Sequence, residues 1–196
     1  KVMEIKNLIG VYRNFLTPKQ ISAFLRSFKD KEFVDAEVIV QDGSSQIDKE
    51  TRLVQHYVLN MNRTMTECHW FNFIRAKMYH CFLNYIEDKN IVVSTSQMQE
   101  LTLLKYGPGG FYKPHVDHRY NPKDMRTSRE ISIIIFLNND YKGGHLHFFD
   151  TNHKEVILDV EPEPGKIIMW PSNFLFPHAA TKVEEGTRFV LLSWLV

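Results

Sequence analysis

Residues 104–117 read LKYGPGGFYKPHVD, and this stretch decides how the second half of the 196-residue chain is expected to fold. An apolar run ends at Tyr106, the sequence GPGG follows at 107–110, and a second strand-like run begins at Tyr112. Glycine and proline supply the backbone angles that tight turns require. The stretch therefore predicts two short strands joined by a turn.

Short strands separated by turn residues continue to the C-terminus. The same pattern predicts strands over residues 99–106, 112–117, 131–137, 145–149, 156–160, 166–170 and 187–195. Many short strands with Gly and Pro turns are typical of a sandwich or barrel. We predict a mainly β fold of the α+β class, with a jelly-roll (double-stranded β-helix) core buttressed by N-terminal helices.

Two amphipathic helices are predicted in the first half of the chain. Thr17 and Pro18 supply a cap and a first-turn proline, and apolar residues then recur at helical spacing as far as Phe28. A second apolar and aromatic series with the same period runs from Thr66 to about Glu87. We expect both helices to pack against one side of the β core.

Two loops are expected to lie near the functional site. Residues 36–40 are strand-like, and the polar stretch 41–50 that follows them is predicted to be a mobile loop. Residues 118–129 form a second long segment without a strand or helix pattern. Loops of this length are often functional.

Length and composition limit the classes of protein that fit. At 196 residues with 43% hydrophobic content, we predict one domain, in which residues 1–99 support residues 100–196. The net charge of +1 provides no general attraction for nucleic acid or an anionic membrane. Two cysteines suggest reduced packing residues, and no apolar run is long enough for a membrane span. We expect a soluble, cytoplasmic monomer or weak oligomer with a trimmed N-terminus, because Lys1 replaces an initiator Met.

Candidate metal ligands lie at the end of the first stretch. Residues i and i+2 of a strand face the same side, so His115 and Asp117 can offer an imidazole and a carboxylate to one ion. His178, which precedes the small residues Ala179 and Ala180, can complete the set. Two histidines and a carboxylate leave positions open on an octahedral metal, as in non-heme Fe(II) sites. Taken singly, the His-x-Asp pair has little specificity, and His178 could be a surface histidine.

Arg188 is a charged residue on an apolar strand face. Alternation along the last predicted strand places it with Val190, Leu192 and Trp194. A buried charge without a partner is costly, so Arg188 must meet either a structural carboxylate or the carboxylate of a ligand. The candidate metal site in the same chain favours the ligand.

His145 and His147 are a rival metal pair of the cupin kind. Such a site would have a glutamate shortly after the second histidine, and none follows His147 closely. We expect both histidines to face solvent or to pack beside the Gly143-Gly144 turn.

Residues 100–196 resemble the catalytic core of the 2-oxoglutarate and Fe(II)-dependent dioxygenases, specifically the prolyl 4-hydroxylase-like branch. The resemblance is carried, in order, by residues 104–117, IIFLN at 134–138, GGHLHF at 143–148, PG at 164–165 with MW at 169–170, PH at 177–178 and GTRFVLLSW at 186–194. Residues 1–99 match less specifically, although that branch also begins with supporting helices.

The resemblance implies a role for each candidate residue. The implied iron ligands are His115, Asp117 and His178. Arg188 would bind the distal carboxylate of 2-oxoglutarate, Tyr106 would add a hydroxyl to that carboxylate, and Trp194 would lie on the pocket wall. Phe136 stands where some relatives have a second tyrosine near the co-substrate.

The implied activity is hydroxylation of an unactivated carbon with Fe(II), 2-oxoglutarate, O2 and ascorbate, with release of succinate and CO2. We expect the substrate to be a prolyl residue of a peptide or protein, bound between the two loops. Two alternatives stay open: the same chemistry on a free amino acid, another side chain or an alkylated nucleobase, and a non-catalytic sensor. The near-zero net charge disfavours the nucleobase, and the complete ligand set disfavours the sensor.

Overall fold

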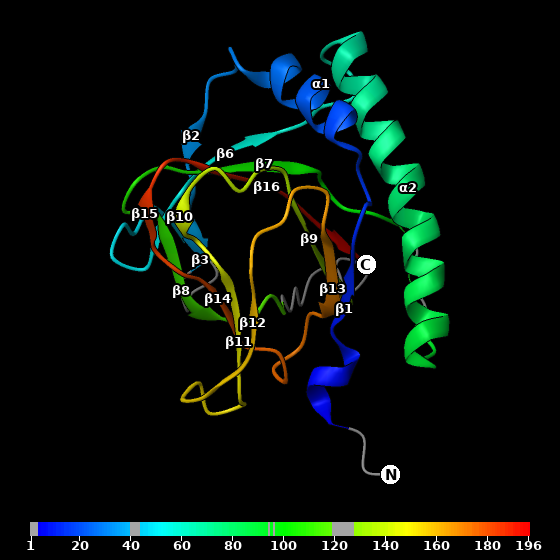
Figure 1. Ribbon diagram of the computed structural model, residues 1–196, viewed down its shortest axis with the longest axis vertical. Coiled ribbons are helices and arrows are strands. Elements are labelled where there is room, and N and C mark those ends of the chain that lie inside the picture. Colours follow the sequence, from blue (N-terminus) through cyan, green and yellow to red (C-terminus); the bar gives the residue numbers. More distant parts are fainter. Residues whose placement is uncertain (1–3, 40–43, 94, 96, 119–127) are drawn as a thin grey trace.

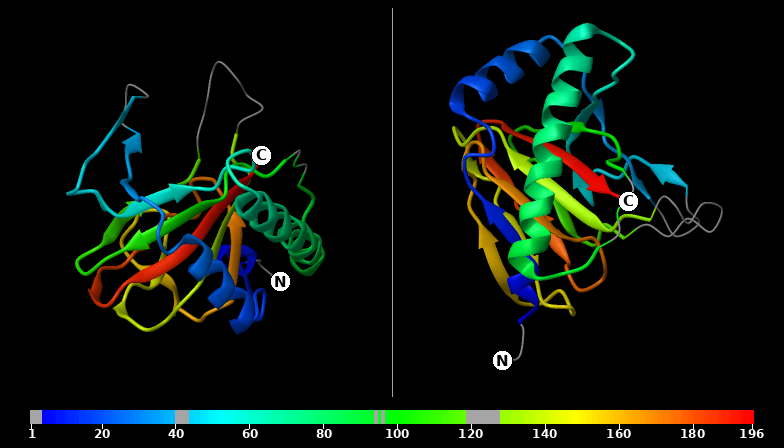
Figure 2. Two further views of the ribbon diagram at one scale, coloured as in Figure 1. Left: turned by 90° about the horizontal axis from the view of Figure 1, so that it is seen from above. Right: turned by 90° about the vertical axis from the view of Figure 1, so that its right-hand side faces the viewer.

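Two facing β-sheets form the body of the protein, and two helices cover one of them (Figures 1 and 2). The computed structural model describes residues 4–39, 44–93, 95, 97–118 and 128–196. Most of the predicted loop at 118–129, and residues 41–43 of the other loop, therefore lie outside the described residues. Within the described residues, neither helix is long and apolar enough to cross a membrane.

The larger sheet has seven antiparallel strands in the order β1-β13-β9-β16-β7-β6-β2. In that order they are Gly10–Tyr12, Ile167–Pro171, Ile131–Phe136, Arg188–Leu195, Thr102–Tyr106, Gln55–Val58 and Val34–Asp35. The smaller sheet has the order β12-β11-β14-β8-β5. Its strands are Val156–Val160, Leu146–Phe149, His178–Ala180, Phe111–His115 and Arg52–Leu53.

Two small two-stranded sheets and a 3-10 helix complete the described secondary structure apart from the two α-helices. β10 (Lys142–Gly143) pairs with β15 (Val183–Glu185), and β3 (Val38–Ile39) pairs with β4 (Ser45–Gln46). The 3-10 helix spans Ile5–Leu8. From β7 onward the chain passes repeatedly between the two large sheets, which confirms the predicted mainly β, jelly-roll architecture.

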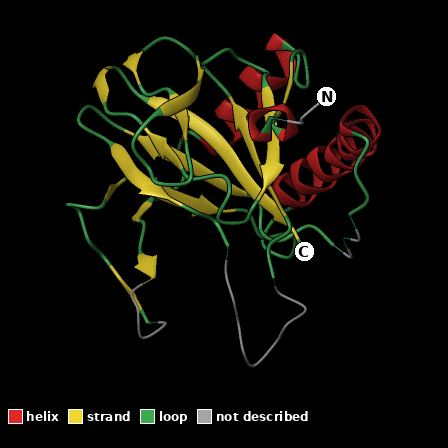
Figure 3. Ribbon diagram, turned by 90° about the horizontal axis from the view of Figure 1, so that it is seen from below, coloured by secondary structure: helices red, strands yellow, loops and turns green. Residues whose placement is uncertain are grey.

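Both predicted helices are present, and they lie on the outer face of the larger sheet (Figure 3). The first, α1 (Pro18–Phe28), begins with a capping box in which Thr17 and Gln20 exchange side-chain and backbone hydrogen bonds. The second, α2 (Met65–Lys89), is capped by Thr64 and ends at Asn90 in the left-handed conformation. The helix pattern of the sequence is thus confirmed to within about two residues at each end.

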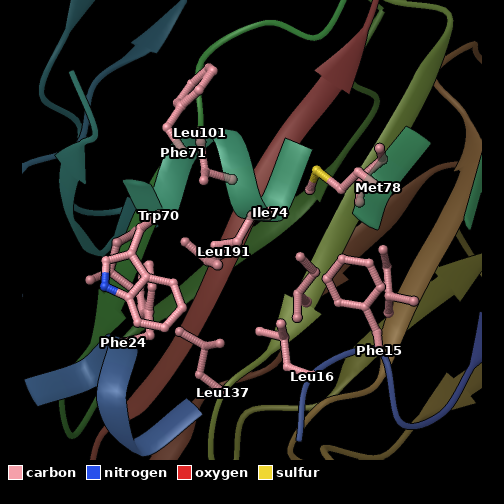
Figure 4. Close-up of a cluster of buried hydrophobic side chains, with 14 of the residues drawn as sticks. Phe15, Leu16, Phe24, Trp70, Phe71, Ile74, Met78, Leu101, Leu137 and Leu191 are labelled. Carbon is pink, nitrogen blue, oxygen red and sulfur yellow. The ribbon is translucent and has the colours of Figure 1, made fainter. Parts of the chain in front are cut away.

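Alternation along the strands of the larger sheet divides the core in two. Toward the helices, Leu191 and its neighbours pack against Phe24, Trp70 and Ile74 (Figure 4). Toward the smaller sheet, the other residues of the same strands form an inner cluster. The members of this inner cluster that matter below are Leu104, Tyr106, Ile134, Phe136, Leu146, Phe148, Trp170, Val190, Leu192 and Trp194.

The prediction of a structureless loop over residues 41–50 is wrong in part. Ser45 and Gln46 pair with Ile39 and Val38 as a two-stranded hairpin. Strands of two or three residues show no periodicity that a sequence could reveal, and β1, β2 and β5 are missed for the same reason.

A buried carboxylate ties α2 to the sheet. Glu67 has no exposed surface and accepts hydrogen bonds from Lys31 Nζ (3.0 Å), the Tyr57 hydroxyl (2.9 Å) and the Asn60 N–H (2.9 Å). Burial alone would raise the pKa of Glu67, but these hydrogen bonds outweigh burial and hold it below the ordinary glutamate value. The carboxylate is therefore charged at neutral pH and fully partnered.

Glu67→Ala should lower the free energy of unfolding by about 1.5–3 kcal/mol, because it removes the buried charged acceptor of the hydrogen bonds from the Tyr57 hydroxyl, the Asn60 N–H and the partly exposed Lys31. Urea unfolding at pH 7 measures this loss. The pKa of Glu67 is lower in the folded protein than in the unfolded chain. The ionised carboxylate therefore stabilises the fold at pH values above the unfolded pKa, and this contribution is lost as the pH falls through the folded pKa. The difference in the free energy of unfolding between wild type and Glu67→Gln should accordingly shrink at acid pH. A difference that grows at acid pH would contradict a charged, hydrogen-bonded Glu67.

Candidate active site

Two strands of the smaller sheet bring the three predicted metal ligands together. His115 ends β8, His178 begins β14, and the two residues are register partners. Asp117 lies two residues beyond β8, with its Oδ1 3.7 Å from His115 Nε2 and its Oδ2 3.5 Å from His178 Nε2. The ligand atoms all lie within 4.8 Å of one another. A single ion could therefore reach all three side chains.

Hydrogen bonds orient both imidazoles with Nε2 toward the carboxylate. His115 Nδ1 lies 2.8 Å from the carbonyl oxygen of Lys113, and His178 Nδ1 lies 3.0 Å from the carbonyl oxygen of Phe176. A carbonyl oxygen can only accept, so each Nδ1 carries the proton and each Nε2 keeps its lone pair. This is the tautomer that binds a metal through Nε2.

Burial controls the charge of the triad. It lowers the pKa of His115 well below the ordinary value, and the neighbouring His178 adds to this effect. Burial alone would raise the pKa of Asp117, but His178 and His115 outweigh it and the carboxyl stays ionised. Asp117 Oδ2 accepts no hydrogen bond from the described residues. A cation would complete this donor set, and two imidazoles with one carboxylate fit Fe(II).

Arg188 is a fully buried cation at the start of β16. It has no exposed surface, and none of its three side-chain nitrogens donates a hydrogen bond within the part of the chain that the structure describes. Its guanidinium carbon lies 4.5 Å from the ring centre of Tyr106 and 5.4 Å from that of Phe136. Ring contacts do not satisfy N–H donors, so the geometry leaves Arg188 available for the carboxylate of a ligand.

Tyr141 is a second buried polar group beside Arg188, and sequence reasoning gave it no role. Its hydroxyl has no hydrogen-bond partner among the described residues. A Cβ built on Gly144 would lie 2.9 Å from the Tyr141 ring and 3.1 Å from Arg188 Cδ, so both side chains converge on this glycine. Burial raises the pKa of Tyr141 to about 12, although the charge of Arg188 opposes this, so the hydroxyl remains a donor. The one feature of the sequence that could have pointed to Tyr141 is its position just before the Gly143-Gly144 turn.

The remaining predicted residues line the same space. Tyr106 contacts Arg188 with its ring, and Phe136 contributes a ring without a hydroxyl, as expected. Trp194 is 9% exposed, its indole Nε1 has no partner among the described residues, and Arg129 lies 3.4 Å from its ring centre. Trp194 therefore belongs to the inner cluster, and its place on a pocket wall stays a prediction.

The triad and the Arg188 region border the same inner cluster. Trp170 contacts His178 edge-on with ring centres 4.9 Å apart, and Tyr112 stacks on His115 at 3.6 Å. Trp170 and Tyr106 belong to the inner cluster, and Tyr112 packs against that cluster. The smaller sheet thus carries the candidate metal ligands and the larger sheet carries the buried Arg188, and both groups border one inner cluster.

Comparison with known families identifies this arrangement. Residues 101–196 match the family model of the 2OG-Fe(II) oxygenase superfamily, and this range contains all six predicted site residues. The matched range is about half of the chain, and it is this half that is similar to the 2OG-Fe(II) oxygenase superfamily. The candidate ligands His115, Asp117 and His178 and the buried Arg188 all lie within the matched range.

Curated proteins that match part of this chain include prolyl 3-hydroxylases. Human prolyl 3-hydroxylase 1 is 32% identical over 68 residues, which is 35% of this chain and 9% of that protein. Mouse prolyl 3-hydroxylase 3 is 35% identical over 68 residues, again 9% of its length. The matched part thus spans less than a tenth of these curated relatives.

Solved structures share the fold over almost the whole chain. A prolyl 4-hydroxylase from Pseudomonas putida aligns with a TM-score of 0.70 and 21% identity, covering 96% of this chain and 92% of that chain. A prolyl hydroxylase from Trichoplax adhaerens, in complex with a hypoxia inducible factor oxygen degradation domain peptide fragment, aligns with a TM-score of 0.71 and 15% identity, covering 96% and 83%. At these identities the likeness shows the fold.

Proposed function

We propose that this protein is an Fe(II)- and 2-oxoglutarate-dependent dioxygenase that hydroxylates a prolyl residue in a peptide or protein. The observation that carries the proposal is the buried, unpartnered guanidinium of Arg188, which faces the same interior as the His115–Asp117–His178 triad. The names of its relatives, prolyl 3- and 4-hydroxylases, support the prolyl substrate.

Each residue has a defined task in this proposal. His115, Asp117 and His178 would hold the iron through two Nε2 atoms and a carboxylate, which leaves coordination positions for other ligands. The bound iron, with 2-oxoglutarate and O2, supplies the oxidising chemistry that yields succinate, CO2 and the hydroxylated carbon.

The co-substrate would be held at its far end by the larger sheet. Arg188 would bind the distal carboxylate of 2-oxoglutarate with its planar guanidinium. The Tyr141 hydroxyl, which is buried beside Arg188 and protonated, would donate to the same carboxylate. Tyr141 could thus supply the phenol that Phe136 lacks. Tyr106 would add its hydroxyl or, through its ring, hold the guanidinium in place.

Tyr141→Phe should raise the 2-oxoglutarate concentration needed for half-maximal succinate formation by about tenfold or more, because hydrogen bonds to charged groups contribute about 1.5–3 kcal/mol. The ring and its packing are retained. Tyr79→Phe, on the exposed face of α2, is the matched control and should have no effect. An unchanged requirement in Tyr141→Phe would remove Tyr141 from the co-substrate site.

The class of substrate can be identified by finding which compounds increase the rate of succinate formation. Purified protein with Fe(II), ascorbate and 2-oxoglutarate should form succinate faster with proline-containing peptides than with free amino acids or methylated oligonucleotides. The peptide should gain the mass of one oxygen atom on proline, and amino-acid analysis would distinguish the third from the fourth carbon. Stimulation by another substrate class, without any by the peptides, would contradict the prolyl assignment while leaving the dioxygenase proposal intact.

A further inference from the structure

A second group of metal-binding side chains lies outside the candidate active site. Leu146 and Phe148 of β11 are buried in the inner cluster, so His145 and His147, which alternate with them, face outward. Asp159 is the register partner of His147 on β12, the adjacent edge strand of the smaller sheet (Figure 1). Three potential ligands therefore share one outer face of the sheet.

Both imidazoles point a nitrogen at the same carboxylate oxygen. Asp159 Oδ1 lies 2.8 Å from His145 Nδ1 and 3.4 Å from His147 Nε2. The three ligand atoms all lie within 4.8 Å of one another. A tetrahedral zinc ion with ligands at about 2.0–2.1 Å separates those ligands by roughly 3.3 Å, so only small side-chain movements would be needed.

The backbone under this group is held on both sides. β11 pairs with β12 at Leu146↔Val160 and with β14 at Leu146↔Ala180. The N–H of His145 donates to Thr181 Oγ1 at 2.8 Å, which fixes the residue that immediately precedes the strand. Much of the conformational entropy cost of assembling the site is therefore met by folding, before any ion binds.

An ordinary ion pair between His145 and Asp159 accounts for less of this geometry than a metal site does. A single His145–Asp159 contact would satisfy both groups, and exposed pairs of this kind contribute little. The register of β11 on β12 already places His147 opposite Asp159, but the ion pair uses only one of the two imidazoles. A divalent cation would use all three groups, with the two neutral imidazoles and the carboxylate as donors and water completing the shell.

We propose that His145, His147 and Asp159 form a second divalent-metal site that takes Zn2+ and is distinct from the His115–Asp117–His178 site. Phe148 is the register partner of His178, and His147 is its neighbour in the chain. The two sites thus lie on opposite faces of the same strand pair. Zinc binds the outer site without displacing the ion of the inner one.

Zinc stoichiometry of the metal-free protein tests this proposal and does not require turnover. Equilibrium dialysis with metal analysis should find two Zn2+ per wild-type chain. His145→Asn combined with His147→Asn should bind one. His69→Asn combined with His80→Asn, two exposed histidines of α2, is the matched control and should still bind two.

A complementary variant separates the sites. Asp117→Ala should retain the outer ion with unchanged affinity while the inner one is weakened. One Zn2+ per wild-type chain, or two in the His145/His147 double variant, would overturn the proposal. Circular dichroism would show whether the double variant fails to fold. In that case Asp159→Asn provides the test, and it should weaken zinc binding at the outer site by at least about tenfold. Unchanged outer binding in Asp159→Asn would overturn the proposal as well.

Discussion

Asp117→Ala is expected to abolish succinate formation and to weaken Fe(II) binding by more than about a hundredfold. Even residues that only support metal ligands typically contribute about 10–100-fold to metal affinity, so loss of a ligand should exceed that range. Asp117 is the anionic member of the triad, and it lies within 3.7 Å of His115 Nε2 and within 3.5 Å of His178 Nε2. Its removal leaves two neutral imidazoles for the ion.

The same variant should not unfold the protein. In the metal-free state Asp117 is a buried carboxylate whose Oδ2 accepts no hydrogen bond from the described residues, so alanine removes a charged group from the interior together with its attraction to the two neighbouring histidines. Iron binding, succinate formation and urea unfolding should be measured together. Asp30→Ala, an exposed residue after α1, is the control and should behave as wild type. Wild-type turnover in Asp117→Ala would disprove the iron site.

Arg188→Ala is expected to raise the 2-oxoglutarate requirement by about two orders of magnitude or more. Removing one partner of a buried charge pair costs about 3–5 kcal/mol, and each 1.4 kcal/mol corresponds to about a tenfold change in affinity. Arg188 would be the partner of the distal carboxylate in that pair. The affinity for Fe(II) alone should change little, which separates this variant from Asp117→Ala.

Arg188→Met separates a ligand-binding arginine from a structural one. If Arg188 were paired with a structural carboxylate, its replacement would destabilise the ligand-free protein. No described residue accepts a hydrogen bond from its guanidinium, so methionine should leave the free energy of unfolding unchanged or raise it, while weakening 2-oxoglutarate binding. Arg26→Met on the exposed side of α1 is the control. Marked destabilisation of Arg188→Met without loss of 2-oxoglutarate binding would contradict the assignment.

The parts of the site that could be predicted from sequence are those that depend on local periodicity or on motif resemblance. Alternation along the last strand placed Arg188 on the interior face with Val190 and Leu192, as observed. The candidate metal ligands were proposed from the His-x-Asp spacing and from the family resemblance, and the structure brings their ligand atoms within 4.8 Å of one another. His178, which seemed to lie at the edge of a loop, is the first residue of β14.

What the sequence could not show depends on contacts between distant segments. Tyr141 and Arg188 both pack on Gly144, and the approach of Arg188, which lies far along the chain, does not follow from the residues around Tyr141 in the sequence. His145 and His147 face outward as expected, but their shared partner Asp159 comes from the register of β11 on β12. A shift of that register by one residue would turn Asp159 to the other face. The single-domain organisation and the monomeric or weakly oligomeric state stay predictions.

The central claim is tested most directly by succinate formation from 2-oxoglutarate by the purified wild-type protein, with and without Fe(II), alongside Asp117→Ala. The account predicts turnover that requires both Fe(II) and 2-oxoglutarate, is increased by a proline-containing peptide, and is absent in the variant. No Fe(II)-dependent succinate from folded wild-type protein under any of these conditions, or equal turnover in the variant, would contradict it.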